Sequence, residues 1–372
     1  MGGAEKHALS LADYYKNHLG WDTEVWAWFE KSGRVKEICE SINVKTKLVP
    51  PFHKFRRRLY KLQLKSYAKI FDEEKVDVVM TFNNKPNILT SGFANKSNIK
   101  LHVWAQQGID AYTDVFQSDL EKKFIKKVPC FISNSFNGKN WLGIKHGVDT
   151  NKVQVVQNGI LEPENLTPKK DWEFKLGLDT SGKTKYFKAA MVANLTYMKD
   201  HVTLVKAWRI VVDNLKEKGV VPLLFFAGRV DVAGEEIQKL TLDLGLTQNV
   251  TLLGALKDIL GFVNSMDLAV LSSPTEGVPN AVLESMILSK PFAGTNIPGI
   301  REAVGEDNYQ FLAEEKDAEG LAEKILLFAN NEQLRIEQGE KNKESVLGRF
   351  SLETMWKETH AIVTGELKKN GR

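Results

Sequence analysis

The sequence predicts an α/β protein built from two doubly wound domains with parallel sheets. Short runs of apolar and β-branched residues alternate with amphipathic stretches of helical period along the whole chain. The apolar runs are continuous, which is typical of parallel strands that helices cover on both faces. The chain has 372 residues, more than one hydrophobic core usually organises, so we expect two such domains.

The expected strands lie on either side of a segment at 161–185, which is rich in Pro, Lys, Glu and Gly and is typical of a linker. The strands expected in the first half are 23–29, 44–49, 76–81, 99–105, 128–133 and 153–156. Those expected in the second half are 187–193, 223–227, 250–253, 268–272 and 291–294. We therefore predict domains at 1–165 and 166–350, with a last helix that begins after a cap at Ser351.

Composition excludes several classes of protein. A chain with 42% hydrophobic residues can bury a core, which argues against intrinsic disorder. No apolar run approaches the roughly 20 residues of a membrane-spanning helix, and no signal peptide is expected at the start. Cys39 and Cys130 are too few for a disulfide framework and lack metal-ligand spacing, so we expect a reducing cytoplasm. A net charge of +4 does not by itself indicate nucleic-acid binding.

The loop at 272–286 carries the clearest chemical pattern. A buried strand ends, a turn containing Glu276 and Gly277 follows, and a helix is expected to begin near Pro279 or Asn280. A carboxylate can accept hydrogen bonds from two adjacent hydroxyls, so Glu276 and Glu284 suit a polyhydroxyl ligand. The exposed backbone N–H groups from Gly277 to Asn280 suit a diphosphate.

This loop resembles the signature of family 4 retaining glycosyltransferases, in which two Glu residues separated by seven positions lie in a Glu-Gly-x-Pro frame. Glu276 and Glu284 have that register, and Gly277 and Pro279 occupy the frame. The resemblance implies the GT-B architecture of two facing Rossmann-like domains with a cleft between them. It also implies that the helix at 351–372 packs back on the first domain.

The resemblance assigns donor-binding roles to residues of the second domain. Lys199 matches the family's phosphate-binding lysine, and a Lys beside a helix start adds its charge to the helix dipole. Asn194 stands where many members carry an arginine, which leaves one cation fewer. Glu276 and Lys199 are the expected catalytic residues. The expected donor-binding residues are Asn194, Lys199, Gly228, Glu276, Gly277, Val278, Pro279, Asn280 and Glu284.

The resemblance also implies an acceptor side in the first domain. Gly2 and Gly3 resemble the family's first glycine-rich turn, and Gln106 and Gln107 stand where many members carry a histidine near the sugar. Family members place a strand before that turn, whereas this sequence starts after it. A sheet without that strand would expose backbone hydrogen-bonding groups on both neighbouring strands.

Other polar residues of the first domain leave two interpretations open. His102 falls inside an expected strand and is predicted to be structural, so no histidine is assigned a catalytic role. The segments 133–135 and 158–159 resemble family positions at strand ends, but ordinary turn and cap chemistry accounts for them equally well.

The segment 52–69 holds seven Lys or Arg residues and no acid, interleaved with Phe, Leu and Tyr at helical spacing. Such a helix can lie on an anionic membrane, form a solvated face packed on a sheet, or bind nucleic acid. Because many members of the resembling family act on lipid-linked acceptors, we expect membrane contact and no nucleic-acid partner. The expected location is cytoplasmic, with peripheral attachment to the inner face of the plasma membrane.

Absent motifs narrow the reaction class. The sequence contains no Asp-x-Asp metal clamp, no Gly-x-Gly-x-x-Gly after a strand, no Walker loop and no Gly-x-Ser-x-Gly elbow. We therefore expect a metal-independent retaining glycosyltransferase without a cofactor. It would use a nucleotide-diphosphate sugar, a UDP-sugar rather than a GDP-sugar, and a glycan or lipid-linked acceptor in cell-surface polysaccharide synthesis. The alternatives are a nucleotide-sugar epimerase of the same fold and a non-catalytic nucleotide-sugar-binding protein.

Overall fold

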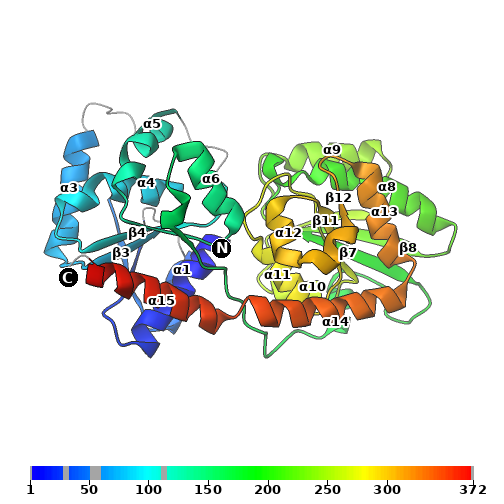
Figure 1. Cartoon of the computed structure of the whole chain (residues 1–372). Coiled ribbons are helices and arrows are strands. Elements are labelled where there is room, and N and C mark those ends of the chain that lie inside the picture. The colour runs from blue at the N-terminus through cyan, green and yellow to red at the C-terminus, as the bar shows by residue number, and fades with distance from the viewer. Residues whose placement is uncertain (1, 28–32, 51–59, 110–114, 370–372) are drawn as a thin grey trace. The chain divides into compact units, whose positions relative to one another are not determined.

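The computed structural model describes residues 2–27, 33–50, 60–109 and 115–369 (Figure 1). The chain divides into two compact units. The first comprises Met1–Gly159 together with Leu352–Arg372, and the second comprises Ile160–Ser351. Both are α/β units with parallel sheets, which confirms the predicted fold class.

The first unit holds two parallel sheets. The two-stranded sheet pairs β1 (Glu24–Ala27) with β2 (Lys45–Leu48). The four-stranded sheet has the order β3 (Val78–Phe82), β4 (Leu101–Gln106), β5 (Cys130–Ser133) and β6 (Val153–Val155). Among the described residues β1 pairs only with β2 and β3 only with β4, so each of these two strands has one edge without a strand partner there. Both strands are mostly half-buried, whereas β4 and β5 are fully buried.

Helices cover both faces of the four-stranded sheet. The helices of this unit are α1 (Gly3–Asp13), α2 (Gly33–Ser41), α3 (Tyr60–Glu73), α4 (Asn84–Phe93), α5 (Val115–Phe124), α6 (Phe136–His146) and α15 (Leu352–Lys369). Alternate residues of β4 face opposite sides: Trp104 packs with Leu64 of α3, while Val103 packs with Leu11 of α1. The apolar face of the last helix, α15, joins the same cluster as α1.

The second unit has one six-stranded parallel sheet in the order β12-β11-β10-β7-β8-β9. Its strands are β7 (Tyr186–Val192), β8 (Val221–Ala227), β9 (Val250–Gly254), β10 (Leu268–Leu271), β11 (Phe292–Thr295) and β12 (Leu312–Ala313). This is the doubly wound order, in which the chain reverses direction across the sheet between β7 and β10. Every strand expected from the sequence has a counterpart among the described residues, and residues 28–29 of the first expected strand lie outside them. In the described part of the chain, the sequence pattern missed β12 because it has two residues.

The helices of the second unit are α7 (Lys169–Lys175), α8 (His201–Lys216), α9 (Gly234–Asp243), α10 (Ile259–Asn264), α11 (Asn280–Ile287), α12 (Pro298–Val304), α13 (Ala318–Ala329) and α14 (Glu332–Arg349). Contacts group α8 with α9 and α13, and α11 with α10, α12 and α14. The expected linker at 161–185 is partly wrong, since it contains α7. Trp172 of this helix is buried and donates a hydrogen bond to Asp258 (2.8 Å).

Candidate active site

The loops after β7 and β10 meet at the switch point of the second sheet. These two strands are neighbours, and their following helices, α8 and α11, belong to different helix groups. Ligands of open α/β sheets bind at the carboxyl ends of the strands, at such a switch point. The two loops are the ones that carry Lys199 and Glu276.

Lys199 and Glu276 form an ion pair across this switch point. The Lys199 ammonium donates a hydrogen bond to Glu276 Oε1, although the two residues are 77 positions apart in the sequence. The Glu276 side chain is 12% exposed and that of Lys199 is 28% exposed. The pair is therefore partly shielded from water but still accessible, which is the environment in which a charge-assisted hydrogen bond is strong.

Local hydrogen bonds hold the Lys199 loop in place. Lys199 ends a 3₁₀ turn, and Asp200 follows with a left-handed backbone (φ 47°). The Asp200 carboxylate caps α8 by accepting hydrogen bonds from the backbone N–H (3.2 Å) and hydroxyl (2.7 Å) of Thr203. Ser272, at the end of β10, donates its hydroxyl to the Asp200 carbonyl (2.8 Å). This bond ties the two loops together beside the ion pair.

Close backbone contact fixes the Glu276 loop from its other side. Gly299, in the first turn of α12, packs directly on this loop. A Cβ atom at Gly299 would lie 1.8 Å from the Gly277 carbonyl oxygen and 2.4 Å from that of Glu276. Gly228 has a similar role beside the β7 loop, since a Cβ there would lie 2.0 Å from the Ala193 carbonyl oxygen.

Asn194 stabilises the β7 loop rather than adding a charge. Its Oδ1 accepts a hydrogen bond from the backbone N–H of Arg229 (3.1 Å), and the backbone N–H of Leu195 donates to the Arg229 carbonyl (2.9 Å). These bonds join the loops after β7 and β8. The amide oxygen of Asn194 is thus occupied by a backbone contact in this structure.

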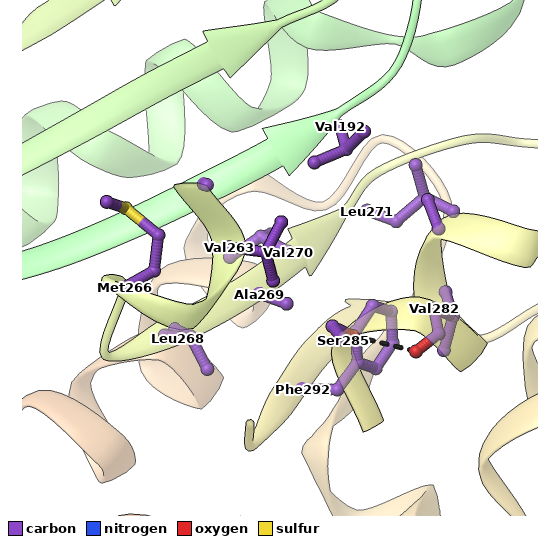
Figure 2. A pocket seen from close by; sticks show the side chains of 12 residues that line it. Val192, Val263, Met266, Leu268, Ala269, Val270, Leu271, Val282, Ser285 and Phe292 are labelled. Carbon is purple, nitrogen blue, oxygen red and sulfur yellow. Dashed lines mark hydrogen bonds between the residues drawn. The ribbon is translucent and has the colours of Figure 1, made fainter. Parts of the chain in front are cut away.

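Helix α11 begins at Asn280, directly after Pro279, as the sequence predicts. It ends at Ile287. The buried face of the helix is apolar except for Ser285. The Ser285 hydroxyl donates a hydrogen bond to the Val282 carbonyl (2.7 Å). Figure 2 shows both residues in an apolar pocket with Phe292 and residues of β10. This pocket is part of the hydrophobic core. Of the predicted donor-binding residues around the start of α11, Val278 and Pro279 are buried, and Asn280 and Glu284 are half-buried.

His201 is a buried residue of this site that the sequence reasoning missed. It is the first residue of α8, it is 1% exposed, and its ring packs edge-on against Phe226 (centroids 5.0 Å apart). Burial, with a smaller contribution from the nearby Lys199 charge, lowers the pKa of His201 to about 4. The imidazole is therefore neutral at physiological pH. In the sequence, the string Lys-Asp-His at a helix start was the pattern that could have indicated His201 as part of this site.

The predicted acceptor-side residues lie in the first unit. Gly2 is the N-cap of α1, and its backbone N–H donates to Glu5 (2.7 Å). Gly3 starts the helix. Gln106 is buried, and both ends of its amide are used internally, since it accepts from the Trp104 indole (2.8 Å) and donates to the Gly108 carbonyl.

Gln107 has different partners from Gln106. Its Oε1 lies 3.0 Å from Nδ1 of His7, a buried residue of α1 that the sequence reasoning did not single out. His102 is buried inside β4 and bonds Thr81 (2.9 Å), and burial lowers its pKa to about 3. This environment agrees with the structural role predicted for His102.

Two family profiles match the chain. The profile described as "Glycosyl transferases group 1" matches residues 178–345, and the one described as "Glycosyltransferase Family 4" matches residues 1–161. Together they span most of both compact units. The chain belongs to the family 4 glycosyltransferases.

Curated relatives of this chain include bacterial enzymes of polysaccharide synthesis. It is 28% identical to the capsular polysaccharide biosynthesis glycosyltransferase CapM of Staphylococcus aureus, over 45% of this chain and 43% of the relative. It is 26% identical to the UDP-Gal:alpha-D-GlcNAc-diphosphoundecaprenol alpha-1,3-galactosyltransferase of Escherichia coli, over 73% of this chain and 71% of the relative. The matches to the first three relatives span 43%, 36% and 37% of their lengths.

Solved structures of similar fold cover nearly the whole chain. A glycosyltransferase from Rickettsia africae has a TM-score of 0.80 at 20% identity, over 99% of this chain and 96% of that one. HepE from Anabaena in complex with UDP-glucose has a TM-score of 0.80 at 17% identity, over 98% and 96%. At these identities the likeness establishes the fold, and these neighbours are GT-B glycosyltransferases.

The structure describes only part of the basic segment 52–69. Residues 52–59 lie outside the described residues, and 60–69 belong to α3. The apolar face of α3 is packed into the unit, with Leu64, Tyr67 and Phe71 buried. Its exposed side carries Lys61, Lys65 and Lys69. The apolar side chain of Leu62 is also exposed, at 60%.

None of the helices between residues 2 and 369 that the structure describes is long and apolar enough to span a bilayer. The same residues contain no cluster of three or more His, Cys, Asp or Glu side chains placed to hold a metal ion. Cys39 and Cys130 are buried, free thiols in separate clusters.

Proposed function

We propose that the protein is a retaining, metal-independent glycosyltransferase that uses a nucleotide-diphosphate sugar, a UDP-sugar rather than a GDP-sugar. The acceptor would be a glycan or a lipid-linked sugar in cell-surface polysaccharide synthesis. The observation that carries the proposal is the Lys199–Glu276 pair at the switch point of the second sheet. The UDP-glucose bound to HepE and the UDP-Gal and diphosphoundecaprenol substrates named for the Escherichia coli relative support it.

The donor would lie over the loops after β7 and β10. Lys199 and the backbone N–H groups from Gly277 to Asn280 would face the diphosphate, because a helix start and an ammonium both favour negative charge. Glu276 would accept hydrogen bonds from sugar hydroxyls, and Glu284 would accept them from the ribose. Asn194, Gly228 and Val278 would shape the loops around the donor.

The transfer step needs no protein side chain to act as a base. The bond between the anomeric carbon and the diphosphate oxygen breaks, and the acceptor oxygen bonds to that carbon on the same face. The proton of the acceptor hydroxyl passes to the departing diphosphate. The role of the protein is to stabilise the charge that develops on the diphosphate, for which Lys199 and the preorganised amides are suited.

A matched pair of variants tests the assignment. Glu276→Gln keeps the size of the side chain but removes its charge, and we expect turnover to fall by about 100-fold or more, with donor affinity by calorimetry largely retained. The control is Glu173→Gln, because Glu173 forms an ion pair of the same chemistry with Lys188 in the same unit. Lys188 lies on β7 before Lys199 and outside the loop. Turnover of Glu276→Gln equal to that of the control would refute the proposal.

Product analysis separates the alternatives. A glycosyltransferase releases nucleoside diphosphate and forms a glycoside only when an acceptor is present. An epimerase would convert the donor alone into an isomer. Donor binding by calorimetry, with no nucleotide release for any acceptor tried, would indicate a binding protein.

We further propose that the protein works at the inner face of the plasma membrane, where lipid-linked acceptors are found. The support is the basic segment 52–69, whose described part exposes Lys61, Lys65 and Lys69 on α3. Lysines near an anionic surface contribute about 1 kcal/mol each to membrane binding.

A further inference from the structure

Four polar side chains of the first unit gather at one edge of its four-stranded sheet. His7 comes from α1, while Gln107, Asn134 and Asn158 each follow the end of a strand, β4, β5 and β6 respectively. Parallel strands end at the same edge of a sheet, so these loops are neighbours. His7 is 6% exposed, Asn134 is 2% exposed and Asn158 is 5% exposed. The cluster is therefore a buried polar group rather than a solvated surface.

Chemistry determines how His7 is oriented in this cluster. Nδ1 of His7 lies 3.0 Å from Oε1 of Gln107, and a carbonyl oxygen can only accept, so Nδ1 carries the proton. The side chain of Asn158 lies beside the same ring. Burial lowers the pKa of His7, which keeps the ring neutral, and its edge also packs against Phe82 (centroids 5.5 Å apart). His7 thus has a fixed tautomer and a fixed ring position.

The bond from His7 determines which end of the Gln107 amide is left for another hydrogen-bonding group. With Oε1 held by His7, Nε2 is the end that can serve another group. Within the described residues this Nε2 atom is buried and has no hydrogen-bond partner. Oδ1 of Asn134 is likewise buried without a partner there, and the Asn134 amide nitrogen donates to the backbone carbonyl of Gln107 (3.5 Å).

An unmatched donor and an unmatched acceptor on two residues that contact each other suit a hydroxyl group. A hydroxyl accepts one hydrogen bond and donates another, so one hydroxyl can satisfy both atoms. Leaving buried polar atoms unpaired costs free energy, which a ligand that pairs them recovers. Gln106 cannot serve in this way, because both ends of its amide are occupied by Trp104 and Gly108.

We propose that His7 is a positioning residue, which orients Gln107 so that Gln107 and Asn134 together bind a hydroxyl of the acceptor sugar. The Gln107 amide nitrogen donates to the hydroxyl oxygen, and the hydroxyl donates to Oδ1 of Asn134. The inference rests on the proposed transferase function for the identity of the ligand. The arrangement of the four side chains does not depend on that function.

Variants of His7 separate positioning from folding. His7→Phe keeps a ring against Phe82 but has no nitrogen, so we expect KM for the acceptor to rise about tenfold, the loss of roughly one hydrogen bond. kcat and KM for the donor should stay near the values of the unaltered protein. His7→Asn places an amide nitrogen close to the position of Nδ1, and we expect it to restore most of the acceptor affinity.

A double variant tests whether His7 acts through Gln107. If it does, His7→Phe combined with Gln107→Ala raises the acceptor KM no more than Gln107→Ala alone. Additive effects, or equal losses in donor KM and acceptor KM, would overturn the proposal.

A readout independent of turnover keeps the inference separate from the transferase assignment. The side-chain amide signal of Gln107, identified by its loss in Gln107→Ala, should shift in an NMR titration with free monosaccharides. It should not shift in His7→Phe. If the protein transfers no sugar but this signal still shifts only when His7 is present, the transferase proposal fails and the positioning role stands. If the signal does not shift for any sugar that the protein uses as acceptor, the positioning role fails.

Discussion

Replacing Gly299 by alanine tests whether the position of the Glu276 loop controls turnover. Alanine is normally the better helix residue by about 0.5–1 kcal/mol, but here the added Cβ would lie 1.8 Å from the Gly277 carbonyl oxygen and 2.4 Å from that of Glu276. Contacts below 3.0 Å are essentially never seen at a real Cβ, so α12 and the loop must separate by at least 1.2 Å. Since α12 is packed within the core, we expect the loop and the Glu276 carboxylate to move.

The expected losses follow from this displacement. Misplacing a catalytic group by about 1 Å can cost on the order of 100-fold in rate. Overpacking in a core typically costs about 1–3 kcal/mol, and 2 kcal/mol corresponds to a fall in Tm of about 4–8 °C for a unit of this size.

The assay is nucleotide release with donor and acceptor, together with a thermal melt of each variant. The matched control is Gly348→Ala in α14 of the same unit, where no atom lies within 4 Å of the added Cβ. We expect the control to be at least as stable as the unaltered protein and equally active. A Gly299→Ala variant with the turnover and Tm of the control would refute the argument that this contact positions Glu276.

Two further predictions concern pH and membranes. His102 and His201 have folded-state pKa values of about 3 and about 4, below the unfolded value of 6.5. The unfolded chain therefore binds more protons, and stability falls as pH drops below 6.5. Between pH 7 and pH 5 the free energy of unfolding should fall by about 2 kcal/mol for each histidine. Denaturant melts of His201→Gln should therefore show a smaller pH dependence than those of the unaltered protein. An equal pH dependence would mean that His201 is charged in the folded state. Replacing Lys61 and Lys65 by Glu should lower the affinity for phosphatidylglycerol vesicles, measured by co-sedimentation, by tenfold or more. Addition of 0.5 M salt should lower it in the same way. Unchanged binding would exclude α3 as the surface that contacts the membrane.

Sequence patterns predicted much of the fold because their physical causes are local. Continuous apolar runs marked the parallel strands, and the Gly and Pro residues around Glu276 marked a strand-to-helix turn. The observed α11 begins at Asn280, where proline and cap chemistry place it. The two-residue strand β12 and the helix within the expected linker were missed, because β12 is too short to show a period and α7 depends on the burial of Trp172.

The sequence by itself determined the fold class, the family and the loops that carry polar chemistry, since periodicity and motif spacing are properties of neighbouring residues. Tertiary structure alone decided which of those residues meet. The Lys199–Glu276 pair joins residues 77 positions apart, and the His7–Gln107 bond joins residues 100 apart. Gly299 became part of the site because the start of α12 packs against the Glu276 backbone. Such contacts arise when strands align in one sheet and bring their carboxyl ends to a common edge, which no local pattern encodes.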